Sequence, residues 1–263
     1  MAFMTGEPPA FFLETPMGAT PPRIASEELS HAIRVRRLGP GDRVTGVDGC
    51  GGRWALEILQ KGPGGVLLEA LEEPQRLPSP GTQGAPLPWI EVAVAWPKKN
   101  RVEGMIGRLV QLGVAAITPL EARHRGPEPV PKRVSKRWKR TAREAFKQSR
   151  GAWLPVLGIG MSVEKLCEER GGGALAILDP RGGMSLDTWL RSVRTSCEGL
   201  GRRERPIVLV IGPEGGFDAQ EMALLLESGA TTCSLGPQVL RVETAAEAAA
   251  AVAACVLELR SER

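Results

Sequence analysis

Tyrosine is absent from this 263-residue sequence, and histidine occurs only twice, as His31 and His124. Two histidines are too few for most transition-metal sites, so no metal is expected. The five cysteines are odd in number and show no CxxC spacing, which argues against both a zinc site and a disulfide framework. No apolar run reaches the roughly 18 residues of a membrane span. Prolines interrupt the N-terminal segment where a signal peptide would need continuous apolar residues, so a cytoplasmic protein with no membrane contact is expected.

The composition is that of a globular protein, with 42% hydrophobic and 24% charged residues. The formal net charge is only +4, but the charge is distributed unevenly. Residues 132–150 contain nine Lys or Arg and one acidic residue, Glu144. A local excess of this kind indicates a polyanionic partner more strongly than the overall charge does.

The chain changes character near residue 72, which predicts two domains. Residues 31–70 contain short strand-like pieces separated by the turn signals Gly39-Pro40-Gly41 and Asp48-Gly49, a pattern typical of a small β-barrel. A stretch rich in Pro, Gly, Ser and Gln follows and is typical of a linker. We therefore predict a β-barrel domain over 1–72, a linker over 73–88 and a second domain over 89–263.

The second domain is predicted to be α/β. Near-continuous apolar runs, as required of strands buried on both faces, alternate with helical patterns. Helices between such strands imply parallel crossovers. The runs occupy residues 90–95, 114–118, 174–178, 207–211 and 231–235.

Two helices of this domain carry capping signals. Asn100 with Glu103, and Asp218 with Glu221, have the spacing of capping boxes, and Gly113 and Gly229 are placed to end the two helices. A last helix over roughly 243–260 is rich in alanine. Its small side chains would allow close approach to the sheet or to another subunit.

Two loops that follow apolar strands are the candidate ligand site. Residues 212–216 read GPEGG after the strand 207–211, and residues 236–237 read GP after 231–235. Ligands of α/β proteins bind at the carboxyl ends of parallel strands, and glycines let the backbone approach a ligand closely. The alternative reading is that each loop is a tight turn, that Thr244 caps the last helix and that Glu243 favours its dipole.

The basic segment is predicted to be an amphipathic helix that contacts nucleic acid. Its apolar face contains Val134, Trp138, Ala142, Ala145 and Phe146. The cationic residues on the other faces have few acidic residues at helical spacing to pair with, which suits contacts to phosphates. A solvated helix face is the alternative.

These motifs resemble the ribosomal RNA small-subunit methyltransferase E family of the SPOUT superfamily. GPEGGF at 212–217 and LGPQVLRVETA at 235–245 are similar to the two signature loops of the family. Further similarity is found in the RW…EA..Q element from Arg137, in the LGV…PL stretch from Leu112, and in HAIRVRRLGPGDRV from His31. The resemblance therefore covers nearly the whole chain.

The resemblance implies a SPOUT-type, trefoil-knotted α/β methyltransferase domain behind a small N-terminal PUA-like β-barrel. It implies an S-adenosylmethionine-dependent enzyme that methylates uridine N3 in 16S rRNA of the small ribosomal subunit, and that acts as a homodimer. The implied cofactor-binding residues are Ile211, Gly212, Pro213, Glu214, Gly215, Gly216, Leu235, Gly236, Val239, Leu240, Arg241 and Thr244. The implied RNA-binding residues are Arg34, Arg36, Arg37, Lys136, Arg137, Lys139, Arg140, Arg143, Lys147 and Arg150.

The mechanism requires charge stabilisation on the uracil oxygens and an acceptor for the N3 proton. Arg241 is the candidate for the first role, with Arg143 or Arg150 as alternatives. Glu243 or Glu214 is the candidate for the second role, or either glutamate is structural. Departures from the family pattern, such as Arg108 and Gln111 in place of Lys and Glu, fall outside the two loops.

Two other functions remain open from the sequence. The chain could be another SPOUT methyltransferase that acts on a ribose 2′-hydroxyl or on another base. It could also be a non-catalytic RNA-binding ribosome assembly factor, which predicts no cofactor binding.

Overall fold

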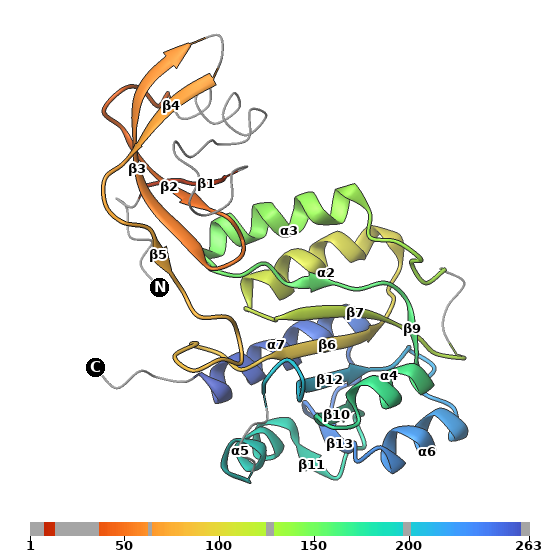
Figure 1. The fold of residues 1–263 in the computed structure, drawn as a ribbon. Helices are drawn as coiled ribbons and strands as arrows, with labels where there is room; N and C mark the ends of the chain where they lie inside the picture. Colours follow the sequence, from red (N-terminus) through yellow and green to blue (C-terminus); the bar gives the residue numbers. More distant parts are fainter. Residues whose placement is uncertain (1–7, 14–36, 63–64, 125–128, 197–200, 259–263) are drawn as a thin grey trace. The chain divides into compact units, whose positions relative to one another are not determined.

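The computed structural model describes residues 8–13, 37–62, 65–124, 129–196 and 201–258 (Figure 1). The chain divides into two compact units. The first contains residues 1–79 together with 146–154, and the second contains 80–145 together with 155–263. The first unit thus includes a late segment that a linear division of the chain assigns to the second.

The first unit contains a mixed five-stranded sheet. Its strands are β1 (Ala10–Phe12), β2 (Arg43–Val47), β3 (Gly52–Gly62), β4 (Gly65–Ala70) and β5 (Gln75–Arg76). β1 pairs in parallel with β2, whereas β2, β4 and β5 pair antiparallel with β3. The strands expected between residues 31 and 70 are therefore confirmed as β2, β3 and β4. The core on one side of this sheet is formed by Phe11, Leu13, Val44, Trp54, Leu56, Ile58 and Leu68.

The segment 146–154 completes the first unit through both ring and backbone contacts. The rings of Phe146 and Phe12 lie 5.4 Å apart between centroids. The amide of Gly51 donates to the carbonyl of Ala152 at 2.8 Å, and the amide of Leu154 donates to that of Gly49 at 2.9 Å. Nothing in the composition of residues 146–154 predicts that this segment packs in the first unit.

The second unit is built on a parallel sheet of eight strands, in the order β11-β13-β10-β12-β6-β7-β8 with β9 beside β7. Every pairing in it is parallel, as expected. The predicted runs at 90–95, 174–178 and 207–211 are confirmed to the residue, while 114–118 is shifted and 231–235 is one residue shorter. The strands are β6 (Ile90–Ala95), β7 (Ala116–Glu121), β8 (Val156–Leu157), β9 (Met161–Ser162), β10 (Ala174–Leu178), β11 (Met184–Ser185), β12 (Ile207–Ile211) and β13 (Thr231–Ser234).

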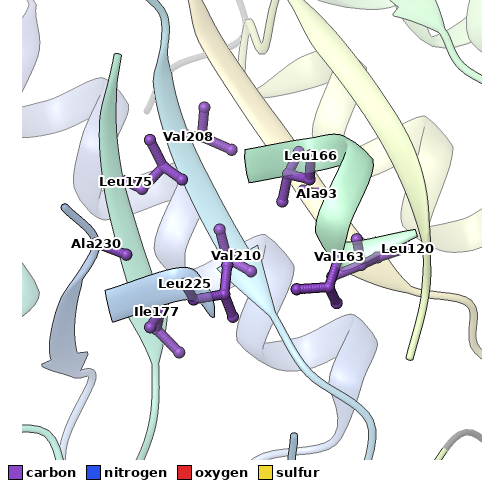
Figure 2. Close-up of a cluster of buried hydrophobic side chains, with 10 residues drawn as sticks. All are labelled: Ala93, Leu120, Val163, Leu166, Leu175, Ile177, Val208, Val210, Leu225 and Ala230. Carbon is purple, nitrogen blue, oxygen red and sulfur yellow. The ribbon is translucent and has the colours of Figure 1, made fainter. Parts of the chain in front are cut away.

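Helices cover both faces of this sheet. α4 (Val163–Arg170) and α6 (Ala219–Glu227) pack together on one face, and Figure 2 shows the aliphatic cluster beneath them. α7 (Val242–Leu257) lies against β6 and β12 and also contacts α2 (Lys99–Gln111) and α5 (Leu186–Ser196). Successive side chains of a strand point to opposite faces of the sheet, so each strand contributes to the cores on both faces. On β12, Val208 and Val210 lie in the cluster beneath α4 and α6. Its members are Ala93, Leu120, Val163, Leu166, Leu175, Ile177, Val208, Val210, Leu225 and Ala230.

The capping predictions have mixed outcomes. Asp218 and Glu221 form the predicted capping box at the start of α6, and Gly229 follows its end with φ +88°. Gly113, with φ +77°, follows α2 as predicted. The box at Asn100 is wrong, because α2 begins one residue earlier, at Lys99, with Lys98 as an N-cap that has no side-chain hydrogen bond.

The small side chains of α7 face its own sheet. Ala246, Ala249, Ala250 and Ala253 are all buried, in a helix that contacts β6 and β12. The helix starts at Val242, so Thr244 lies inside its first turn and is not its cap. Within the described residues, no helix is long and apolar enough to cross a membrane.

A buried ionic group joins α4 to the sheet near the amino end of β6, away from the carboxyl ends of the strands. Glu91 on β6 is 1% exposed. One of its carboxylate oxygens accepts a hydrogen bond from the Thr118 hydroxyl at 2.5 Å, and the other accepts from Nε of Arg170 at 2.8 Å. Burial alone would lower the pKa of Arg170, but the hydrogen bond and charge of Glu91 raise it above its ordinary value.

Candidate active site at the carboxyl edge of the sheet

Three loops meet at the carboxyl edge of the sheet in the second unit. β10 lies between β12 and β13, and the register pairs Leu178 with both Ile211 and Cys233. The loops after these strands, at 179–183, 212–217 and 235–241, therefore leave the sheet side by side. The two loops predicted from the sequence are brought together, with a third between them.

The loop at 179–183 was missed by the sequence analysis. It reads DPRGG directly after the apolar strand 174–178, which repeats the strand-then-Gly/Pro pattern of the other two loops. That repetition is the signal that could have identified it.

The loop at 212–217 is shaped by its glycines. Gly216 has φ +74°, and a side chain there would project into open space. A Cβ on Gly215 would come within 3.2 Å of Cβ of His124, so the segment after β7 lies directly against this loop. Ile211 is buried at the end of β12, while Glu214 is exposed. Within the described part of the chain, no hydrogen bond or ion pair occupies the Glu214 carboxylate.

Arg123 fastens the loop at 212–217 from the neighbouring segment. Its guanidinium lies 2.9 Å from Oδ2 of Asp218 and also donates to the Gln220 amide oxygen. Its backbone amide donates to Glu221 at 2.7 Å. The backbone amide of Glu221, together with Arg123, holds the pKa of Asp218 below its ordinary value. The start of α6, and with it the end of the loop, is thereby fixed.

The loop at 235–241 presents backbone and apolar groups to solvent. Gly236 has φ +140° with open space where a Cβ would lie. Val239 is 84% exposed, so its side chain is open to solvent at this edge. Arg241 is the N-cap of α7, is exposed and has no ion pair among the described residues. Leu235 and Leu240 are half-buried, and Thr244 is exposed.

Glu243, one of the two candidate proton acceptors, is engaged elsewhere. Its carboxylate is almost buried and lies 3.1 Å from the guanidinium of Arg101 on α2. One turn further along α7, Glu247 lies 2.6 Å from Arg108, so two ion pairs join α2 to α7. This arrangement favours the structural role of Glu243 over the catalytic one.

Replacing Glu243 with glutamine is expected to lower the free energy of unfolding by about 1 kcal/mol, as for a partly exposed ion pair. Turnover is expected to be unchanged, because the carboxylate is committed to Arg101. Thermal unfolding and steady-state methylation kinetics check the two expectations, with Arg101→Gln as the matched control. A fall in kcat of about 100-fold would instead assign proton transfer to Glu243.

The loop at 179–183 packs tightly against the last strand. The amide of Asp179 donates to the carbonyl of Cys233 at 2.9 Å. A Cβ on Gly182 would lie 2.5 Å from the carbonyl carbon of Cys233, closer than such atoms approach. A Cβ on the next residue, Gly183, would meet nothing within 4 Å.

Gly182→Ala is therefore expected to displace the backbone at β13 and so to disturb the loop at 235–241. Overpacking of this kind costs about 1–3 kcal/mol of stability, and we expect cofactor affinity to fall by about tenfold. Calorimetric titration and thermal unfolding measure both quantities. Gly183→Ala is the matched control for stability and should unfold as the wild type does; equal stability of the two variants would contradict the packing argument.

Other chemistry at this edge is limited. Burial raises the pKa of the Cys233 thiol to about 11, so the thiol stays protonated at neutral pH and is a poor nucleophile. The described cysteines 50, 167, 233 and 255 are all free thiols. Among the described residues, no group of three or more His, Cys, Asp or Glu could hold a metal ion.

The predicted basic helix is present as α3 (Lys136–Ser149), and most of its cations are exposed. Ala142, Ala145 and Phe146 are buried on its apolar face. Arg137 differs from the expectation of unpaired charges, because it lies 2.5 Å from Glu103 of α2. Arg34 and Arg36 lie outside the described residues. Exposed cationic candidates are Arg37, Lys136, Arg137, Lys139, Arg140, Arg143 and Arg150, and Lys147 is half-buried.

Comparison with known proteins agrees with this geometry. The sequence model of the RNA methyltransferase domain family matches residues 84–254, which contain all three loops. Ribosomal RNA small subunit methyltransferase E of Mycobacterium tuberculosis is 32% identical over 233 residues, which cover 86% of this chain and 83% of that protein. The protein of the same name from Synechocystis is 30% identical over 239 residues, with 89% and 73% covered.

Structural comparison gives the same class of fold. The crystal structure of a ribosomal RNA small subunit methyltransferase E from Neisseria gonorrhoeae, bound to S-adenosyl methionine, superposes with a TM-score of 0.70 at 20% identity and covers 93% of this chain and 96% of that one. The matched sequence model and this shared fold together define an RNA methyltransferase domain. Within that class, the chain belongs to the ribosomal RNA small subunit methyltransferase E family.

Proposed function

We propose that this protein transfers a methyl group from S-adenosylmethionine to N3 of a uridine in 16S rRNA of the small ribosomal subunit, in the cytoplasm. The observation that carries the proposal is the convergence of the three loops at one sheet edge, within the region that matches the RNA methyltransferase domain. The relatives named for small-subunit RNA methylation support the choice of substrate.

The residues at this edge fit the cofactor. The open space over Gly216 and Gly236 allows a ligand to approach the backbone of both loops closely. The exposed Val239 and half-buried Leu240 offer an apolar surface for a purine ring. We propose that the loops at 179–183, 212–216 and 235–244 hold the cofactor, with the backbone of Ile211 and Leu235 at their bases.

S-adenosylmethionine, when bound, supplies an electrophilic methyl group on a positively charged sulfur. Uridine N3 must lose its proton as its lone pair forms the new N–C bond. We propose that Glu214, the exposed carboxylate of the loop at 212–217, accepts this proton. We propose that Arg241 stabilises the negative charge on the uracil oxygens.

Three structural features of the family accompany the proposal. A trefoil knot is supported by the position of β10 between β12 and β13 and by the contact of Gly182 with the Cys233 backbone. We propose that the N-terminal domain is a PUA-like RNA-binding barrel. We also propose that the cationic residues of α3 bind the RNA substrate. A homodimer, which the resemblance to the family implies, completes the proposal.

The experiment is a methylation assay with small ribosomal subunits that lack the modification. Purified protein is incubated with these subunits and labelled S-adenosylmethionine, and the RNA is digested to nucleosides for mass spectrometry. Labelled 3-methyluridine is the expected product. A 2′-O-methylated nucleoside, or one methylated on another base atom, would show that N3 is not the target. Absence of cofactor binding would indicate a non-catalytic assembly factor.

A further inference from the structure

Two tryptophans meet beside the candidate active site. Trp96 directly follows β6, and Trp138 lies on α3. Their ring centroids are 5.0 Å apart, with an interplanar angle of 59°. Both side chains are half-buried, so part of the pair is accessible to a ligand.

The pair adjoins two of the loops. β6 is the neighbour of β12, and Val94 pairs with Ile211, so the loop at 212–217 leaves the sheet beside Ala95 and Trp96. The first turn of α2, which begins three residues after Trp96, contacts the start of α7 through Arg101 and Glu243. Trp96 therefore follows the strand beside the loop at 212–217 and precedes the helix that contacts α7.

Exposed cationic residues lie close to both tryptophans in the sequence. Lys98 and Lys99 are exposed at the start of α2, whose first turn contains no acidic residue. Lys139 and Arg140 follow Trp138 on α3 and are also exposed. Aromatic rings flanked by exposed cations are the arrangement by which proteins bind unpaired nucleotides, with the base on the ring and the phosphate on the cations.

The indole groups themselves are available. The comparably buried Trp153 donates its indole N–H to the carbonyl of Leu77 at 3.1 Å. Among the described residues, neither Trp96 nor Trp138 has such a partner. Neither indole nitrogen is buried without a partner, so both N–H groups reach solvent and are accessible to a ligand.

We propose that Trp96 and Trp138 form a stacking platform for an unpaired base of the RNA substrate at the site of methyl transfer. The proposal rests on the proposed function and adds the residues that position the base. Uridine N3 lies on the Watson–Crick edge, so the base must leave any pairing before it reacts, and an aromatic platform offsets the lost stacking.

The test compares Leu and Phe variants at each position. Trp96→Leu and Trp138→Leu are expected to raise KM for small ribosomal subunits by about 10- to 100-fold, the effect of losing one base–aromatic contact. The dissociation constant for S-adenosylmethionine should not change. The Phe variants should keep most of the wild-type KM, because stacking needs only an aromatic face. Trp89→Leu is the matched control, since Trp89 precedes the same strand at the opposite edge of the sheet.

Photochemical cross-linking gives a readout that does not depend on a variant's stability. A short uridine-rich RNA carrying 5-iodouridine is irradiated with the wild-type protein, and the cross-linked peptide is identified by mass spectrometry. Cross-links at Trp96 or Trp138 are expected. Folded Leu variants with wild-type KM, Phe variants as impaired as Leu variants, or cross-links only at other residues would each overturn the platform.

The two proposals can fail separately. Label transfer by the wild type with unaffected Leu variants would overturn the platform and leave the methyltransferase proposal intact. Cross-links at the two tryptophans without any label transfer would leave the platform and overturn the proposed reaction.

Discussion

Replacing Arg170 with methionine is expected to lower the free energy of unfolding by about 3 kcal/mol, because it leaves the buried carboxylate of Glu91 without its counter-charge. Glu91 is 1% exposed, and of its two hydrogen-bond donors only the Thr118 hydroxyl would remain. A methionine keeps much of the apolar length of arginine, so the loss reports on the charge more than on packing. Urea or thermal unfolding followed by circular dichroism measures it.

Two further variants isolate the cause. The double variant Arg170→Met with Glu91→Met should recover most of the lost stability, because an apolar pair of similar size replaces a buried ion pair at little cost. Arg191→Met removes a surface partner of Asp187, 3.7 Å away on the same helix, and should leave the stability essentially unchanged because water screens this pair. If the double variant is less stable than Arg170→Met alone, the charge argument is wrong.

Loss of the buried ion pair should lower stability without lowering the rate of methyl transfer. Glu91 lies near the start of β6, whereas the three loops follow the carboxyl ends of the strands. Arg170→Met should therefore methylate at the wild-type rate at temperatures where it is folded. Its activity should be lost only as the protein unfolds.

The central strands of the second unit, β6, β10 and β12, could be predicted because they are largely buried on both faces. These three strands are near-continuous apolar runs, interrupted only by Glu91 in β6, and they differ from the expected ranges by no residue. Such a run can be recognised from consecutive residues alone, because each apolar side chain indicates a buried position. The start of α2 could not be predicted in the same way. Asn100 has the spacing of a capping residue, but the chain turns into the helix one residue earlier.

The order of the strands in the sheet cannot be predicted from residues that are adjacent in the sequence. The two loops with recognisable motifs follow β12 and β13, which are consecutive along the chain, yet β10 lies between them in the sheet. No pattern of side chains within either motif predicts that insertion, so the loop at 179–183 was missed. The same holds for residues 146–154, whose contacts with Gly49 and Gly51 join segments far apart in the sequence.

The partner of Glu243 shows the same limit at a single residue. Near the start of a helix, an acidic side chain is explained equally well by the helix dipole and by catalysis. Only the fold places Arg101 of α2 beside it, at 3.1 Å, and thereby favours a third explanation. Arg241, two residues earlier, has no such partner among the described residues and remains the candidate for chemistry.

Arg241→Ala is expected to lower kcat by about 100-fold, the usual effect of removing one donor to charge that develops during a reaction. Uracil carries its negative charge on two carbonyl oxygens once N3 has lost its proton, and a guanidinium offers several donors to them. Binding of S-adenosylmethionine should change little, because the proposed cofactor contacts of this loop come mainly from its backbone. Single-turnover methylation and calorimetric titration measure the two effects separately.

The neighbouring loop supplies a matched control for this variant. Arg181 is 91% exposed at the same edge of the sheet and is paired with Asp179, so its guanidinium is already neutralised. Arg181→Ala should keep wild-type kcat, whereas Arg241→Lys, which retains the charge but loses the planar fork of donors, should fall between the wild type and Arg241→Ala. Full turnover by Arg241→Ala with unchanged cofactor binding would remove this arginine from the reaction. Charge stabilisation would then fall to Arg143 or Arg150.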